Sequence, residues 1–132
     1  MTPAFFLVMS VMLVAVASFS LGKNFLNGSR ALSMDARAMA EKAISGNQVM
    51  VFSKSYCPFC TKTKSSLDGL GISYGVFELD NMKEGADIQS ALQDITGQRT
   101  VPNVFVSGKH IGGNDATQAA IKNGSFQAAL KK

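Results

Sequence analysis

The order of apolar and helical stretches in the middle of the chain predicts a strand, a helix and a second strand. Gln48–Ser53 and Ser73–Leu79 are short apolar runs rich in residues that favour strands. Between them, Cys57–Gly69 has helical character, and Pro58 occupies the first helical position, where proline is favoured. This order is typical of a β-α-β unit.

Helices are also expected before and after this unit. Ser33 is a suitable capping residue for a helix over residues 34–45, which has an acid in its first turn and is followed by Gly46. Glu84–Thr96 places its apolar residues on one helical face, and Gly97 follows it as a stop. Each of these patterns predicts one helix.

The last third of the chain predicts a hairpin followed by helix. Asn103–Val106 and Lys109–Ile111 are joined by Ser107 and Gly108, which suits a tight two-residue turn. Helical character then continues from the Gly112-Gly113 pair to the end of the chain. A β-α-β unit followed by a hairpin and a helix predicts an α/β fold, with a mixed sheet flanked by helices on both faces.

Residues 3–21 form an uncharged apolar stretch unlike the rest of the chain. A secretory signal peptide would use Phe5–Val14 as its apolar core and the small residues 15–17 as its cleavage site, but it lacks the basic residues that normally precede such a core. A transmembrane anchor is the alternative, because about 17 to 25 apolar residues span a bilayer. The charge of Lys23 after the stretch would then place the domain in the cytosol.

The chain is therefore divided into three parts: an apolar signal or anchor segment over residues 1–22, a linker over 23–32 and a domain over 33–132. The predicted location is the endomembrane system, or a membrane to which residues 5–21 anchor the protein. The alternative is the cytoplasm or an organelle after cleavage of the leader.

Composition limits the classes of function. With 132 residues and 46% hydrophobic residues, the chain is long enough for one globular domain but not two. Its net charge of +4 comes from 13 basic and 9 acidic residues, and leaving out Lys23 and Arg30 reduces it to 11 minus 9, or +2. Such a balance does not make the basic stripe that a nucleic-acid groove needs, so nucleic acid is excluded as a partner.

The two cysteines make the one constellation with evident chemistry. Cys57 and Cys60 are three residues apart at the start of a predicted helix, so their α-carbons should lie about 5 to 6 Å apart, within reach of a disulfide. Closing so short a loop would stabilise the fold by only about 2 kcal/mol. Redox cycling therefore explains the pair better than structural stapling does.

The two sulfurs are expected to differ in reactivity. Cys57 stands where unpaired backbone N–H groups and the helix dipole favour an anion, and Lys54 adds a positive charge, so we expect a lowered pKa there. Cys57 would serve as nucleophile and leaving group, and Cys60 as the resolving thiol. A structural zinc site needs about four ligands, and His110 is expected to be an ordinary surface or strand residue, so no metal site is predicted.

Three motifs together resemble the dithiol class of glutaredoxins. They are Lys54–Cys60, Thr100–Phe105 and Gly112–Asp115, in the order and approximate spacing of that family. The resemblance covers residues 33–130. It implies a thioredoxin fold with a four-stranded mixed sheet, and a cis peptide bond between Val101 and Pro102.

The resemblance also implies glutathione as the co-substrate, with no tightly bound cofactor. Phe59 stands where many members have tyrosine, and Ala116 where many have aspartate or another polar residue. Lys54, Gln89 and Arg99 would face the glycine carboxylate of glutathione. The residues implied to bind glutathione are Lys54, Tyr56, Phe59, Gln89, Arg99, Val101, Pro102, Gly113, Asn114 and Asp115.

The predicted function is that of a glutathione-dependent thiol–disulfide oxidoreductase, acting as a monomer on protein–glutathione mixed disulfides and on protein disulfides. A rival hypothesis is a dimer that carries an iron–sulfur cluster on Cys57 of each copy, with glutathione completing the ligand set. The stiff Pro58 argues against that cluster. A third hypothesis, suggested by the apolar leader, is a thiol oxidase of an oxidising compartment, which the reduction potential of the cysteine pair would distinguish.

Overall fold

A computed structural model describes residues 28–130 and shows one four-stranded sheet, in the order β2-β1-β3-β4. The central strand β1 is parallel to β2 and antiparallel to β3, and β3 is antiparallel to β4. The sheet is therefore mixed, as predicted. The strands are β1 (Val49–Ser53), β2 (Gly75–Glu78), β3 (Asn103–Val106) and β4 (Lys109–Gly112).

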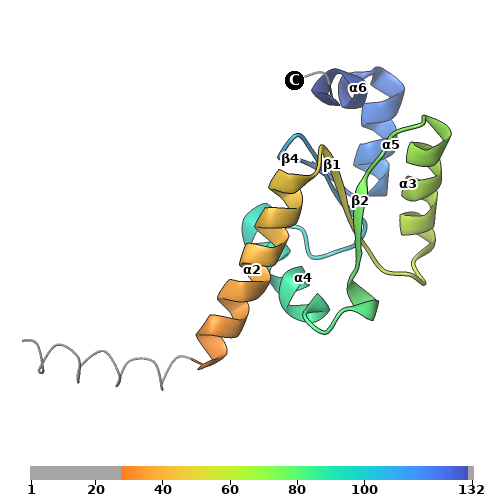
Figure 1. Cartoon of the computed structure of the whole chain (residues 1–132). Coiled ribbons are helices and arrows are strands. Elements are labelled where there is room, and N and C mark those ends of the chain that lie inside the picture. Colours follow the sequence, from red (N-terminus) through yellow and green to blue (C-terminus); the bar gives the residue numbers. More distant parts are fainter. Residues whose placement is uncertain (1–27, 131–132) are drawn as a thin grey trace, which may run out of the picture. The chain divides into compact units, whose positions relative to one another are not determined.

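Helices cover both faces of this sheet. Figure 1 shows α2 and α4 on one side of the strands, and α3 and α5 on the other. This arrangement confirms the predicted architecture of a mixed sheet between two helical layers. The helices are α2 (Gly28–Gly46), α3 (Pro58–Gly69), α4 (Gly85–Thr96), α5 (Asn114–Asn123) and α6 (Ser125–Leu130), with a 3₁₀ turn η1 (Leu79–Asn81).

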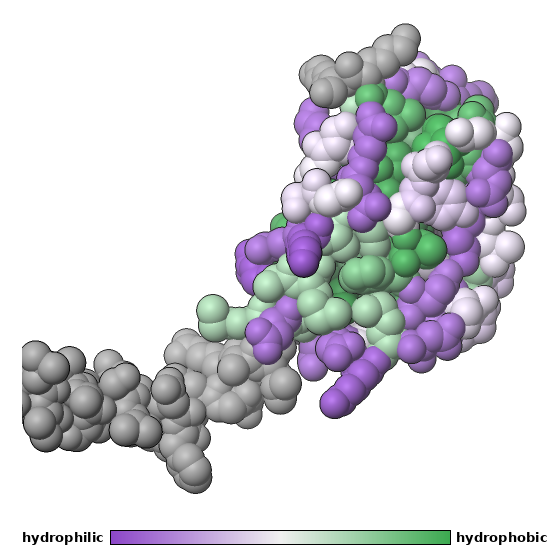
Figure 2. Space-filling view, viewed as in Figure 1, coloured by the Kyte–Doolittle hydropathy of each residue, from purple (hydrophilic) through white to green (hydrophobic). Residues whose placement is uncertain are grey.

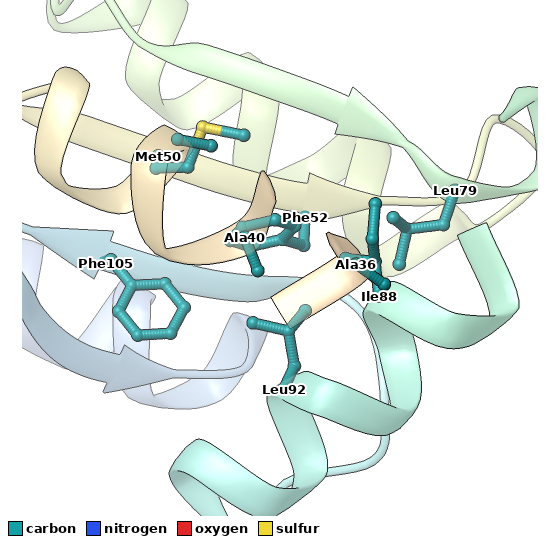
Figure 3. Close-up of a cluster of buried hydrophobic side chains, with 9 residues drawn as sticks. Ala36, Ala40, Met50, Phe52, Leu79, Ile88, Leu92 and Phe105 are labelled. Atoms are coloured by element: carbon teal, nitrogen blue, oxygen red, sulfur yellow. The ribbon is translucent and has the colours of Figure 1, made fainter. Parts of the chain in front are cut away.

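The alternation of β1 supplies side chains to both layers. Met50 and Phe52 point towards α2 and α4, while Val49 and Val51 point towards the opposite layer, because neighbouring residues of a strand face opposite ways. All five residues of β1 are buried. Figure 3 shows the first of these clusters, in which Phe52 lies among side chains from α2, α4 and β3.

Three element boundaries differ from those predicted. Helix α2 already begins at Gly28, so Ser33 lies inside the helix and does not cap it. Strand β2 is shorter than predicted at both ends: it begins at Gly75, and the chain turns into η1 at Leu79. The last helical region is two helices, because Gly124 adopts a left-handed conformation with φ 83° and ends α5.

The location predicted from the amino-terminal segment has to be corrected. Between residues 28 and 130, no helix has both the length and the apolar character needed to cross a membrane. Helix α2 is 19 residues long, but it carries Arg37, Glu41 and Lys42. The endomembrane or membrane-anchored location is thus wrong on this finding, and residues 5–21, from which it was predicted, lie outside the described part of the chain.

Apolar side chains also reach the surface. In Figure 2, hydrophobic residues gather in the upper part of the view, with hydrophilic residues among them. Two aromatic side chains that are mostly exposed, Tyr56 at 72% and Phe59 at 60%, flank Cys57 in the sequence. This position makes them candidates for contact with a bound molecule.

Candidate active site

The directions of the strands bring four loops to one end of the sheet. The carboxyl ends of the parallel strands β1 and β2 lie at this end. Because β3 is antiparallel to β1 and β4 is antiparallel to β3, the amino end of β3 and the carboxyl end of β4 lie there as well. The connecting segments at this end are residues 54–57, 79–81, 98–102 and 112–113. Each of the three motifs singled out from the sequence begins in one of them and continues into α3, β3 or α5.

Cys57 caps the amino end of α3. Its backbone is extended, with φ −82° and ψ 119°, and its Sγ accepts a hydrogen bond from the backbone N–H of Cys60 at 3.3 Å. Pro58 follows as the first helical residue, as predicted. The Cys57 thiol also donates to the carbonyl of Val101 at 3.8 Å. The sulfur is therefore held at a helix start, where a negative charge is favoured.

Cys60 has a different environment from Cys57. Its side chain is fully buried, whereas Cys57 is partly exposed. Burial, supported by a hydrogen bond with the Cys57 side chain, raises the pKa of the Cys60 thiol from 9.0 to about 11. Hydrogen bonds with Lys54 and Ser53 lower it only in part. At neutral pH Cys60 is consequently a thiol that is inaccessible to large molecules.

The loop before Cys57 is fastened to the end of the neighbouring strand. The Asp80 carboxylate in η1 accepts hydrogen bonds from the Ser55 backbone N–H, at 2.9 Å, and from the Ser55 hydroxyl. These hydrogen bonds, assisted by the charge of Lys54, lower the pKa of Asp80. Asp80 was missed in the sequence, because only the parallel pairing of β1 and β2 brings it next to Ser55.

Side-chain amides hold the loop before β3. Gln98 Nε2 donates to the carbonyls of Thr100 and Pro102, at 3.0 and 2.9 Å. Gln89 Nε2, from α4, donates to the Arg99 carbonyl at 2.7 Å. The Val101–Pro102 peptide is cis, which confirms what the resemblance implied. This loop therefore presents its backbone beside the Cys57 sulfur.

Two hollows open on this end of the molecule. The first hollow, of about 460 Å³, contains Cys57, and the second, of about 490 Å³, lies beyond Phe59. They share Thr100 and Val101, so together they form a groove across the Cys57 loop. The first is lined by Lys54, Tyr56, Cys57, Pro58, Gln89, Arg99, Thr100 and Val101, and the second by Phe59, Thr100, Val101, Pro102, Gly113, Asn114, Asp115 and Ala116.

The structure thus brings together all the residues that were expected to bind glutathione, although their roles stay predictions. Thr100 was missed, even though it stands between two expected residues, Arg99 and Val101. His110 lies on β4, with Nε2 hydrogen-bonded to Asn103 Oδ1 at 2.8 Å. Burial lowers the pKa of His110, and the residue lines neither hollow.

The two ends of the groove differ in charge. Lys54 and Arg99 line the first hollow, so that end suits a carboxylate. In the second hollow, Gly113 precedes α5 and provides no side-chain cap, so the backbone N–H groups of the first turn have no capping partner. Asp115, also in the second hollow, adds an acceptor for an ammonium group. An extended molecule with a carboxylate at each end and an amine at one end would match this pattern.

Comparison with known proteins gives a consistent result. A family model described as Glutaredoxin matches residues 49–111. A protein from Ricinus communis named glutaredoxin is 54% identical over 95 residues, which cover 72% of this chain and 93% of the relative. The similarity therefore extends over nearly the whole length of that relative.

Solved structures show the same similarity. A buckwheat glutaredoxin–glutathione complex superposes with a TM-score of 0.74 at 42% identity, covering 76% of this chain and 92% of the other. The holo form of glutaredoxin C1 from Populus tremula x tremuloides superposes with a TM-score of 0.71 at 41% identity, covering 74% and 96%. The thioredoxin fold that the resemblance implied is confirmed.

Proposed function

The chain belongs to the glutaredoxin family of thiol–disulfide oxidoreductases, and we propose that it uses glutathione to reduce mixed disulfides between proteins and glutathione. The observation that carries this proposal is the pairing of a partly exposed helix-capping Cys57 with a groove that is basic at one end and rich in free N–H groups at the other. Glutathione has a carboxylate at each end and a thiol in the middle. Its charges match those of the groove.

The reaction begins at Cys57. Its sulfur, as thiolate, attacks the glutathionyl sulfur of the mixed disulfide, so a Cys57–glutathione bond forms while the protein–glutathione bond breaks. The released protein thiolate takes up a proton. The thiolate of a second glutathione then attacks the glutathionyl sulfur on Cys57, glutathione disulfide leaves, and Cys57 is regenerated. One free glutathione is thereby consumed for each mixed disulfide reduced, and the other half of the glutathione disulfide comes from the substrate.

Glutathione would bind across both hollows. Lys54 and Arg99 would pair with the glycine carboxylate, while the Val101 backbone would bond to the tripeptide as an added strand does. At the other end, the N–H groups at the start of α5 would bind the γ-glutamyl carboxylate, and Asp115 its ammonium group. A structural relative from buckwheat, solved in complex with glutathione, supports glutathione as the bound molecule.

Cys60 would act only on protein disulfides. After Cys57 forms a mixed disulfide with a protein, Cys60 attacks the Cys57 sulfur and closes an intramolecular disulfide. The 3.3 Å contact between the Cys60 N–H and Cys57 Sγ places the two residues together. Because Cys60 is buried, its thiol is shielded from other disulfides. No observation on residues 28–130 favours the iron–sulfur dimer, which stays a prediction, as do the monomeric state and the absence of a tightly bound cofactor.

The test compares the two cysteines with a glutathionylated peptide as substrate. Cys57→Ser should abolish turnover, because no nucleophile remains. Cys60→Ser should keep much of the activity, because the glutathione route does not use Cys60. Equal loss in the two variants, with both folded by circular dichroism, would reject the mechanism. Replacing the glutathionyl group by a cysteinyl group in the same peptide should lower the rate with the unmodified protein, and an unchanged rate would reject glutathione recognition.

A further inference from the structure

Side-chain hydrogen bonds join α3 to α5 at two pairs of residues, Thr63 with Asn114 and Ser66 with Gln118. Thr63 Oγ1 donates to Asn114 Oδ1 at 2.9 Å, and Thr63 is fully buried. Nearly one turn further along α3, Gln118 Nε2 donates to Ser66 Oγ at 2.8 Å. Both pairs connect the same two helices, so they offer a matched comparison.

The two bonds lie at different distances from the candidate site. Asn114 is the first residue of α5 and lines the second hollow. Thr63 belongs to the helix that Cys57 caps. Ser66 and Gln118 line neither hollow. Only the Thr63–Asn114 bond therefore connects the cysteine helix directly to the wall of the groove.

The Thr63 hydroxyl also determines what the Asn114 side chain does. An asparagine at a helix start readily bonds with nearby backbone groups, in competition with other partners. Here Asn114 is mostly buried, and its Oδ1 accepts from Thr63 and, at 3.3 Å, from Gln118. Held in this way, the side chain stays in the interface between the helices, and the backbone N–H groups at the start of α5 remain open to the groove.

We propose that Thr63 is a positioning residue for glutathione recognition, acting through Asn114 on the first turn of α5. The bond fixes where the open N–H groups stand relative to the Cys57 sulfur, and so where the γ-glutamyl end of glutathione lies when its sulfur meets Cys57. This inference rests on the proposed function. It assigns no direct contact with glutathione to Thr63.

The experiment compares Thr63→Val, which keeps the shape but removes the hydroxyl, with Ser66→Ala, which removes the other bond. The loss of one hydrogen bond predicts that Thr63→Val raises KM for the glutathionylated peptide about three- to tenfold with little change in kcat. Ser66→Ala should leave KM unchanged, and Thr63→Ser should restore it. The rate of Cys57 alkylation by iodoacetamide, which has no γ-glutamyl group, should be the same in all variants.

A double-mutant cycle keeps the proposal falsifiable if one variant folds poorly. Asn114→Ala should raise KM as Thr63→Val does, and combining the two changes should add little, because both remove the same bond. Equal KM values for Thr63→Val and Ser66→Ala, or a fall in alkylation rate in Thr63→Val alone, would overturn the inference. An unmodified protein that does not distinguish glutathionyl from cysteinyl peptide would instead reject the proposed function, and that result is visible before any variant is made.

Discussion

The two faces of the sheet bury different kinds of side chain. The face under α2 and α4 is filled by aliphatic and aromatic groups, and Phe52 meets Phe77 and Phe105 edge to face, with ring centroids 5.7 and 5.8 Å away. The face under α3 and α5 also has an apolar cluster, but near the site it buries the Cys60 thiol, the Thr63 hydroxyl and the Asn114 amide.

This difference indicates that one face mainly stabilises the fold, while the other also positions the site. Burying apolar area stabilises the fold without regard to direction, whereas buried polar groups destabilise it unless each has a partner. Hydrogen bonds have preferred directions, so the polar groups of the α3–α5 face can fix the placement of the Cys57 helix and the groove. Substitutions on the two faces should accordingly affect different measured quantities.

The largest expected effect is on the α2–α4 face. Phe52→Ala should lower the free energy of unfolding by about 3 to 5 kcal/mol, because it removes a fully buried ring and leaves a cavity. Urea unfolding measures the loss, with Phe52→Leu as a control that should lose less. Activity per folded molecule should stay close to that of the unmodified protein. A large rise in KM or fall in kcat in the folded fraction would show that the α2–α4 face also affects activity.

A smaller effect is expected from the buried thiol of the other face. The folded state raises the pKa of Cys60 from 9.0 to about 11, so between these values the folded protein holds a proton that the unfolded chain has released. Stability should fall as pH rises through this window, by at most about 2 to 3 kcal/mol. Cys60→Ala should show a shallower fall, measured by urea unfolding at pH 8 and pH 10.5 under reducing conditions. Parallel curves for the two proteins would contradict the assignment to Cys60.

Much of the fold follows from short-range patterns. The uninterrupted apolar run at β1 predicts a buried strand, and all five of its residues are buried. Gly97, with φ 77°, ends α4 where the sequence indicated. Ser33 predicts a helix start because serine is a favoured capping residue, but α2 already begins at Gly28. Local propensity is a weak guide to where a helix begins, since α2 starts at Gly28 although glycine disfavours helix.

The candidate site likewise has one part that the sequence predicts and one part that it does not. The residues of the three motifs could be placed at the site because the family resemblance carried them, and the structure gathers them into one groove. The hydrogen bonds that support these residues could not be predicted from the sequence. Thr63 and Asn114 are 51 residues apart and Ser55 and Asp80 are 25 apart. Whether such pairs are in contact depends on the directions of the strands and the rotations of the helices. Local sequence spacing does not determine either.

The smallest effect is expected at Asp80, which ties the Cys57 loop to the end of β2. Asp80→Asn keeps the size and an acceptor for the Ser55 N–H but removes the charge. Because the group is exposed, water replaces much of what is lost, so kcat/KM for the glutathionylated peptide should fall by less than about threefold. Asp94→Asn, on an exposed position of α4, is the control for a general charge effect.

A larger loss at Asp80 would change the comparison between the faces. If kcat/KM fell by more than about tenfold, the loop before Cys57 would depend on the end of β2 as strongly as on the α3–α5 interface. The Cys57 helix would then be positioned from two directions, and the same fall should appear in the rate of alkylation by iodoacetamide. A fall in turnover without a fall in alkylation would instead place the effect on Lys54, whose charge Asp80 faces, and hence on binding in the first hollow.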